Sequence, residues 1–205
     1  SQDLFNVLIK LGLTEHLSIK LKYVPTNCGN IFVEQNKKQK FIATKRQPIC
    51  SSVDLIGDQD LRDSLELADY VFLASSWKVW EADMLSVSLD FIDDTTDASI
   101  VIFGGKHIPV PDYKKYIGST VQQRELSSVN LSMDHPFNKL RGVSRDPRHV
   151  FIDVHKLVCG DIQDKCSIYT SGGFLKSYDG YHLTKYGVSD LGQQLREPLL
   201  DILGL

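Results

Sequence analysis

The sequence has no apolar run of the roughly 18 residues that a membrane-spanning helix requires, and no signal peptide opens it. It has no CxxC pair and no histidine at ligand spacing from a cysteine, which argues against a structural zinc site. Because nucleotide-binding loops, dinucleotide fingerprints and metal-ligand clusters are missing too, we expect neither a cofactor nor a metal. The net charge is −3 without any basic stripe, so no nucleic-acid partner is expected.

The chain also lacks a starting methionine, and we therefore expect it to be part of a longer polypeptide. Its 205 residues are 42% apolar, which is enough to bury a sizeable core. No internal repeat, low-complexity tract or convincing linker divides the sequence. We expect residues 1–205 to form a single domain.

Four cysteines are present, Cys28, Cys50, Cys159 and Cys166. Four cysteines allow three pairings, and adjacency in the sequence favours Cys28 with Cys50 and Cys159 with Cys166. Oxidised cysteines would indicate an extracytoplasmic compartment, whereas four reduced cysteines would fit a cytosolic protein.

Hydrophobic periodicity divides most of the chain into helices and strands. Helices are expected over Asp3–Leu17, Leu55–Ala68, Trp77–Ile92 and Leu183–Leu205, the third with Trp80, Met84, Val87 and Phe91 on one face. Strands are expected over Leu17–Val24, Asp69–Ser75, Ser99–Gly105 and His149–Val154. The alternation predicts an α/β fold with a parallel sheet covered on both faces, whose functional residues lie at the carboxyl ends of the strands.

A possible catalytic pair lies near the C-terminus, in the stretch "SYDGYHLTKYG" from Ser177 to Gly187. With this spacing the Asp179 carboxylate can turn back to the near ring nitrogen of His182, which leaves the far nitrogen available to a serine. A serine nucleophile needs such a base, and the base needs a carboxylate to fix its tautomer. The pattern alone is weak, because Asp and His occur at this spacing by chance.

The surrounding order makes the sequence resemble the SGNH (GDSL-type) hydrolase and acyltransferase superfamily, whose last motif is Asp-x-x-His. The supporting stretches are "ADYVFLASSW", "SIVIFGGKHIPVP" and "HVFIDVHKLVCGDIQDKCSIYTSGGFLKSYDGYHLT". Within the superfamily, the likeness is greatest to domains attached to membrane acyltransferases of the acyltransferase-three family, which O-acetylate surface polysaccharides. The resemblance implies a three-layer α/β/α sandwich, flavodoxin-like, with a central parallel sheet.

The nucleophile of that superfamily lies in a Gly-Asp-Ser turn after the first strand, and this chain has no Gly-Asp-Ser. Ser1 is one candidate for the nucleophile. Alternatively, Ser1 is the second residue after the nucleophile. A Ser1 without any catalytic role would be an ordinary helix N-cap. Either alternative implies that the domain as given lacks its first strand and part of the nucleophile turn.

The resemblance also implies an oxyanion hole, which is built from the amide of the nucleophile, a backbone amide on the next motif loop and usually an Asn. The matching loops begin at Ser75 and Gly104, and "GGKH" stands where the Asn is expected. Gly105 or Lys106 would then supply a backbone amide instead. The predicted oxyanion and substrate pocket comprises Ser75, Ser76, Trp77, Gly104 and Gly105. Trp77 is either a core residue or a platform for a sugar ring.

Two interpretations follow. In the first, the chain is an extracytoplasmic enzyme that takes an acyl group, expected to be acetyl, onto a serine and passes it to a sugar hydroxyl or to water. His182 is then the general base and acid, Asp179 orients it, and the partners are a surface polysaccharide and a membrane acyltransferase domain of the same polypeptide. In the second, the chain is a non-catalytic SGNH-like module that binds a glycan or a partner.

Overall fold

The computed structural model describes residues 2–25, 27–106, 108, 110, 118–125, 128–130, 140–143, 146–160 and 165–205. The chain forms two compact units, each described by itself below. The sheet unit comprises Lys20–Gly105 and His135–Ile152, and the helical unit comprises Ser1–Ile19, Lys106–Asp134 and Asp153–Leu205.

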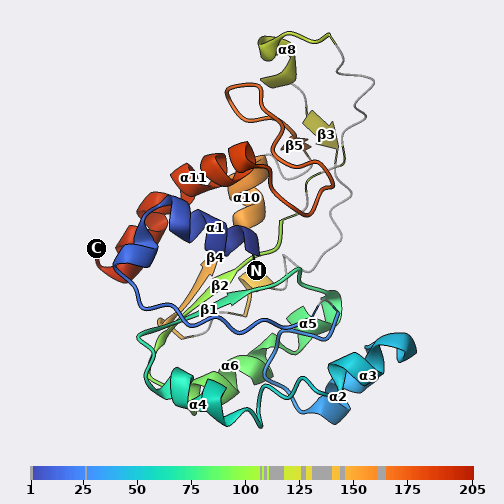
Figure 1. The fold of residues 1–205 in the computed structure, drawn as a ribbon, viewed down its shortest axis with the longest axis vertical. Helices are drawn as coiled ribbons and strands as arrows, with labels where there is room; N and C mark the ends of the chain where they lie inside the picture. Colours follow the sequence, from blue (N-terminus) through green and yellow to red (C-terminus); the bar gives the residue numbers. More distant parts are fainter. Residues whose placement is uncertain are drawn as a thin grey trace. The chain divides into compact units, whose positions relative to one another are not determined.

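The sheet unit is built on a three-stranded parallel sheet in the order β1-β2-β4 (Figure 1). The strands are β1 (Tyr70–Ala74), β2 (Ser99–Phe103) and β4 (His149–Ile152), each inside one of the apolar runs that predicted a buried strand. Ile100, Val101 and Ile102 are all fully buried although they point to alternate faces, as expected for a central parallel strand. The mixed α/β class is therefore confirmed.

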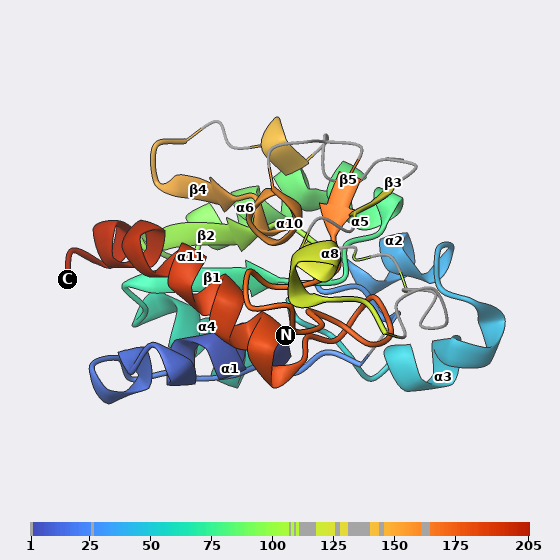
Figure 2. The same ribbon diagram turned by 90° about the horizontal axis from the view of Figure 1, so that it is seen from above.

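Helices α4 (Gln59–Glu66) and α6 (Leu85–Asp93) pack on one face of this sheet (Figures 1 and 2). Strand side chains such as Val71, Leu73 and Ile100 form one apolar core with Leu65 and Leu89 of the helices. Burial of these side chains contributes roughly 1.5 to 3 kcal/mol each to the free energy of folding. Further helices in the described part of this unit are α2 (Gln35–Gln39), η2 (Thr44–Arg46), α3 (Gln47–Cys50) and α5 (Val79–Asp83).

The predicted strand Leu17–Val24 is wrong, because residues 18–25 form neither a helix nor a strand. Two apolar side chains of the alternation are largely uncovered, since Leu21 is 63% exposed and Tyr23 is 79% exposed. The lysines of the segment instead reach the N-terminal end of α4, where Lys22 pairs with the Asp58 carboxylate and Lys20 donates to the Asp60 carbonyl.

The helix predicted over Trp77–Ile92 is two helices, α5 and α6, which are separated at Met84. The buried face also differs from the predicted one. Leu85, Leu89 and Ile92 are buried, whereas Val87 is 47% exposed. The predicted helix over Leu55–Ala68 begins later, because Asp58 caps α4 by accepting the Leu61 N–H at 3.1 Å.

The helical unit is centred on two long helices that lie side by side, α1 (Gln2–Lys10) and α11 (Lys185–Leu203) (Figure 1). Val7 and Leu8 of α1 and Leu191, Leu195 and Leu199 of α11 are buried. Helix α1 ends earlier than predicted, because Gly12 takes a left-handed conformation with φ of 72°. Other elements in the described part of this unit are η1 (Leu13–Glu15), α8 (Val121–Glu125), β3 (Ser128–Asn130), α10 (Val154–Cys159) and β5 (Lys165–Ser167), with β3 and β5 antiparallel.

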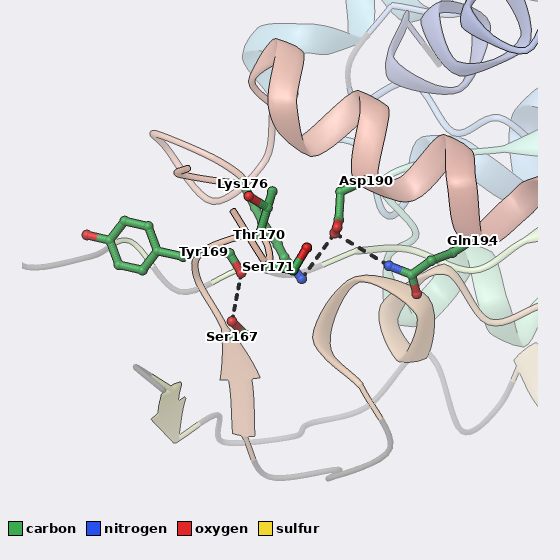
Figure 3. A pocket seen from close by; sticks show the side chains of 7 residues that line it. All are labelled: Ser167, Tyr169, Thr170, Ser171, Lys176, Asp190 and Gln194. Atoms are coloured by element: carbon green, nitrogen blue, oxygen red, sulfur yellow. Dashed lines mark hydrogen bonds and ion pairs between the residues drawn. The ribbon is translucent and has the colours of Figure 1, made fainter. Parts of the chain in front are cut away.

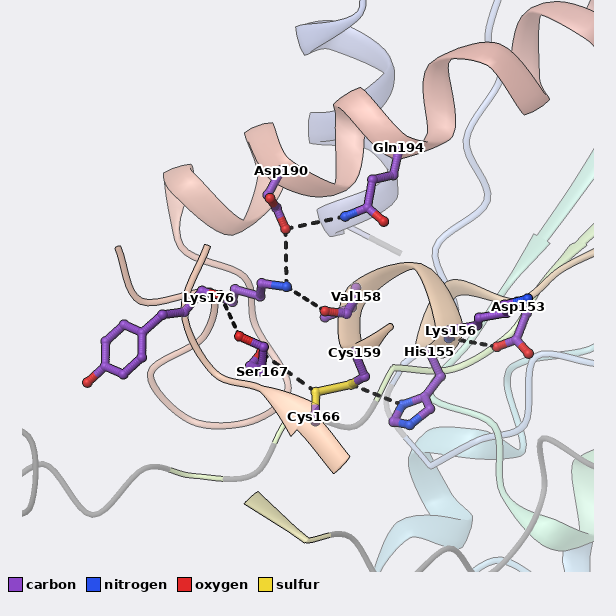
Figure 4. The surroundings of a disulfide bond; sticks show 11 residues. Asp153, His155, Lys156, Val158, Cys159, Cys166, Ser167, Lys176, Asp190 and Gln194 are labelled. Carbon is purple, nitrogen blue, oxygen red and sulfur yellow. Dashed lines mark hydrogen bonds and ion pairs between the residues drawn. A yellow bond between two sulfur atoms is a disulfide. The ribbon is translucent and has the colours of Figure 1, made fainter. Parts of the chain in front are cut away.

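Both disulfides that adjacency favoured are present, Cys28–Cys50 in the sheet unit and Cys159–Cys166 in the helical unit. The second joins the end of α10 to β5 (Figure 4). Disulfides persist in extracytoplasmic compartments, so the pairing is compatible with that location. Among the described residues, no helix has the length and apolar character needed to cross a bilayer.

Candidate active site

The Asp-x-x-His motif occupies a closed turn of the helical unit, between Ser177 and Leu183. These two residues form an isolated antiparallel bridge at the base of the turn. The Ser177 hydroxyl is buried inside it, where it donates to the His182 carbonyl at 2.7 Å and accepts the Gly180 N–H at 2.9 Å. Gly180 has a φ of 82°, and a Cβ there would lie 2.5 Å from the Ile108 carbonyl oxygen. The turn therefore requires glycine at this position.

Asp179 and His182 are brought together as the sequence predicted. The Asp179 Oδ2 atom lies 2.6 Å from His182 Nδ1, and Oδ1 accepts the backbone N–H groups of Tyr181 and His182 at 2.9 and 2.8 Å. One carboxylate thus holds both the backbone of the turn and the Nδ1 atom of the imidazole. The His182 side chain is 65% exposed, and its Nε2 has no hydrogen-bond partner among the described residues.

The hydrogen bonds to Asp179 also fix its charge. The His182 backbone N–H, the His182 ring and the Tyr181 N–H together hold the pKa of the Asp179 carboxyl far below its ordinary value of 3.8. Asp179 is therefore ionised at neutral and mildly acidic pH. An ionised carboxylate on Nδ1 keeps the proton on that nitrogen, which leaves Nε2 as the basic atom.

The N-terminal end of α1 lies against the same turn. The buried Asp3 Oδ2 atom accepts the backbone N–H of Leu183, the residue after His182, at 3.4 Å. The same oxygen pairs with Lys106 Nζ at 2.7 Å. Residues that are 180 apart in the sequence are thus in contact, and the first turn of α1 lies beside the residue that follows His182.

Ser1, the predicted nucleophile, lies outside the described residues, as does His107 of the "GGKH" stretch. The predicted oxyanion residues belong to the sheet unit, where Ser75, Ser76 and Trp77 follow β1, and Gly104 and Gly105 follow β2. The predicted oxyanion residues therefore belong to a different unit from Asp179 and His182, which are the two described members of the predicted catalytic set and are in contact.

Two of the predicted pocket residues already serve the fold. The Gly104 N–H donates to the Ile152 carbonyl at 2.8 Å, which extends the β2–β4 ladder. Trp77 is buried, and its indole N–H donates to the Phe103 carbonyl at 2.7 Å, which favours its role as a core residue. Of the two glycines, Gly105 is consequently the better candidate for an oxyanion donor.

The sequence did not suggest Asp3 or Ser177 as members of the site, and it suggested Lys106 only for its backbone amide, not for the ion pair of its side chain. For Ser177 a signal existed, because a serine two residues before the aspartate can bond across a turn of this kind. No local signal existed for Asp3 and Lys106, whose contacts depend on the tertiary fold.

A second cluster of possible metal ligands lies in the sheet unit, where donor atoms of Asp93, Asp146 and His149 lie within 4.8 Å of one another. Asp93 Oδ1 accepts from Arg148 at 2.9 Å and contacts His149 Nε2 at 3.0 Å. Arg148 also pairs with Asp146 at 3.3 Å. The guanidinium already supplies the positive charge that a cation would bring.

Comparison of the chain with protein-family models, with curated proteins and with solved structures gives no match.

Proposed function

We propose that the chain is an SGNH-type serine acyltransferase or esterase that moves an acyl group, expected to be acetyl, to or from saccharide hydroxyls. The observation that carries the proposal is the Asp179–His182 pair, with a 2.6 Å bond on Nδ1 and an Nε2 that faces solvent. The Asp3–Leu183 hydrogen bond supports it, because it holds the first turn of α1 beside the residue that follows the histidine. The proposal includes the three-layer SGNH fold and an extracytoplasmic location, which the two disulfides support.

In the proposed reaction, His182 Nε2 removes the proton of a serine hydroxyl while the serine oxygen attacks the acyl carbonyl carbon. The serine is Ser1 or, in a longer polypeptide, the residue two positions before it. The imidazolium then gives its proton to the departing oxygen, and an ester on the serine remains. A sugar hydroxyl or water then loses its proton to Nε2 and attacks the ester, and the imidazolium returns that proton to the departing serine oxygen. Backbone N–H groups would stabilise the oxyanion.

The test is to label the protein, extended upstream of Ser1 by its native sequence, with a serine-directed fluorophosphonate and to locate the adduct by mass spectrometry. We expect an adduct on a serine at or just before Ser1, and its loss in His182→Ala. His16→Ala is the matched control, since His16 is an exposed histidine of the same unit. If the folded protein takes no label, the non-catalytic binding module is the better interpretation.

A further inference from the structure

A cavity that is wide open to solvent lies in the surface of the helical unit, with Ser171 and Gln194 exposed, and it shares no residue with the candidate active site. Its volume is about 400 Å³, and its wall consists of Ser167, Tyr169, Thr170, Ser171, Lys176, Asp190 and Gln194. Asp190 and Gln194 project from α11 toward the Lys176 ammonium, and Ser167 is the last residue of β5 (Figure 3). All of these residues belong to one compact unit, so its own packing defines the cavity.

Lys176 is the anchor of the cavity wall. Its side chain is only 9% exposed, and its Nζ donates to the Val158 carbonyl at 2.6 Å and pairs with Asp190 Oδ2 at 3.3 Å (Figure 4). The ammonium is thereby fixed between α10 and α11. A buried ammonium held by two partners does not move aside when a ligand enters, so it presents a preorganised donor.

The cavity has no net charge, because the Asp190 carboxylate balances the Lys176 ammonium. An anion bound to the remaining Lys176 N–H would lie close to the Asp190 carboxylate, and a cation bound to Asp190 would lie close to the Lys176 ammonium. In either case the like charge repels the ligand. The favoured ligand is therefore uncharged.

The wall offers both donors and acceptors to such a ligand. Gln194 Nε2 donates to Asp190 at 3.4 Å, which leaves its carbonyl oxygen as an acceptor. The Thr170 hydroxyl accepts the Phe174 N–H at 3.2 Å and keeps its own proton to donate. The Ser171 hydroxyl forms no hydrogen bond within the described part of the chain. Small-molecule pockets typically occupy about 300–1,000 Å³ and are mostly apolar. This cavity falls within that size range, but its lining residues carry hydroxyl and amide groups, so it matches a ligand that is itself covered with hydroxyl groups.

We infer that this cavity binds an uncharged polyhydroxylated molecule of the size of a monosaccharide unit. Its hydroxyl groups donate to Asp190 and to the Gln194 carbonyl, and they accept from Lys176 and Ser171. The inference does not depend on the proposed function, because binding here requires neither Asp179 nor His182.

The experiment is saturation-transfer NMR followed by isothermal titration, with D-glucose, D-galactose and N-acetyl-D-glucosamine as probes and with glycine and acetate as charged comparisons. We expect at least one sugar to bind with a dissociation constant on the order of 1–10 mM and glycine and acetate not to bind. Gln194→Leu should weaken binding about three- to tenfold. Gln193→Leu, an exposed neighbour on the same helix, is the control and should leave it unchanged.

His182→Ala should retain sugar binding, which separates this inference from the proposed reaction. The inference is overturned if none of the three sugars binds, if glycine or acetate binds in their place, or if Gln194→Leu has no larger effect than Gln193→Leu.

Discussion

At the scale of single residues, Asp179 performs two tasks with one carboxylate, because Oδ1 holds the backbone of the turn and Oδ2 holds the imidazole. Asn at this position keeps a carbonyl oxygen for the backbone N–H groups but presents an NH₂ donor to Nδ1. The imidazole would then move its proton to Nε2 and lose its basic atom. We predict that Asp179→Asn lowers ester turnover on the order of 10⁴-fold, with near-normal thermal unfolding, as checked by steady-state kinetics and circular dichroism.

The pH dependence of the same carboxyl has a definite sign. Hydrogen bonds lower the folded-state pKa of Asp179 below its ordinary 3.8, so the stabilisation is present above that value and is lost only as the pH falls through the lower folded-state pKa. We expect the Asp179 carboxyl carbon to show no NMR titration between pH 7 and about 4. A free peptide of residues 177–184 should begin to titrate in that range. Any loss of turnover above about pH 4 must then come from another group.

Lys38 is a buried cation whose pKa should make stability depend on pH. It is almost fully buried, its Nζ has no hydrogen-bond partner among the described residues, and desolvation lowers its pKa to about 8 although Asp54 and Glu81 oppose this. Between pH 8 and 10.5 the unfolded state holds the proton that the folded state lacks, so stability rises with pH.

Urea unfolding at a series of pH values tests this. The free energy of unfolding of the wild type should rise from pH 8 to 10 relative to Lys38→Met, whereas Lys37→Met, at an exposed position, should follow the wild type. Parallel curves for wild type and Lys38→Met would contradict the assignment.

At the scale of elements, the start of α11 depends on a glycine that packs against backbone. A Cβ on Gly187 would lie 2.2 Å from the Lys176 carbonyl oxygen, and that oxygen accepts the Thr184 N–H that joins the motif turn to the helix. We predict that Gly187→Ala costs about 1–3 kcal/mol in unfolding free energy. In Gly192→Ala the new Cβ would meet only Val7 and Leu11, at 3.8 and 3.9 Å. That variant should be neutral or more stable by about 0.5–1 kcal/mol, as measured by urea unfolding.

The strands and helices differ in how well the sequence predicted them. Continuous apolar runs predicted β1, β2 and β4, because a strand buried on both faces needs apolar residues at every position. Alternation predicted a strand at Leu17–Val24 wrongly, since it specifies which side chains would share a face but not whether a neighbouring strand exists to pair with. Helical spacing over Trp77–Ile92 gave no sign of the break at Met84.

The candidate site likewise contains one contact that the sequence predicted and others that it did not predict. The Asp179–His182 contact is local, and the sequence predicted it because three residues of separation place both side chains on one turn. The contacts of Asp3 with Leu183 and Lys106 join segments that are distant in the sequence, and only the packing of the helical unit brings them together.

At the scale of the whole molecule, the two disulfides lie in different units and should therefore affect different properties. Cys28–Cys50 closes a sequence separation of 22 in the sheet unit, and Cys159–Cys166 closes 7 in the helical unit. Loop-closure entropy assigns about 3 kcal/mol to the longer loop and about 2 kcal/mol to the shorter one. Replacing both cysteines of the first bridge by serine should thus destabilise the protein more.

The rate of fluorophosphonate labelling should depend more on the Cys159–Cys166 bridge than on the Cys28–Cys50 bridge. Cys159 follows Val158, whose carbonyl holds Lys176, and Lys176 directly precedes Ser177 at the base of the Asp179–His182 turn. Cys159→Ser with Cys166→Ser should therefore slow fluorophosphonate labelling, whereas Cys28→Ser with Cys50→Ser should leave the labelling rate of the folded fraction unchanged. Urea unfolding and labelling kinetics on the same two variants measure both effects. Equal slowing in both variants would mean that the dyad depends on the sheet unit as much as on its own.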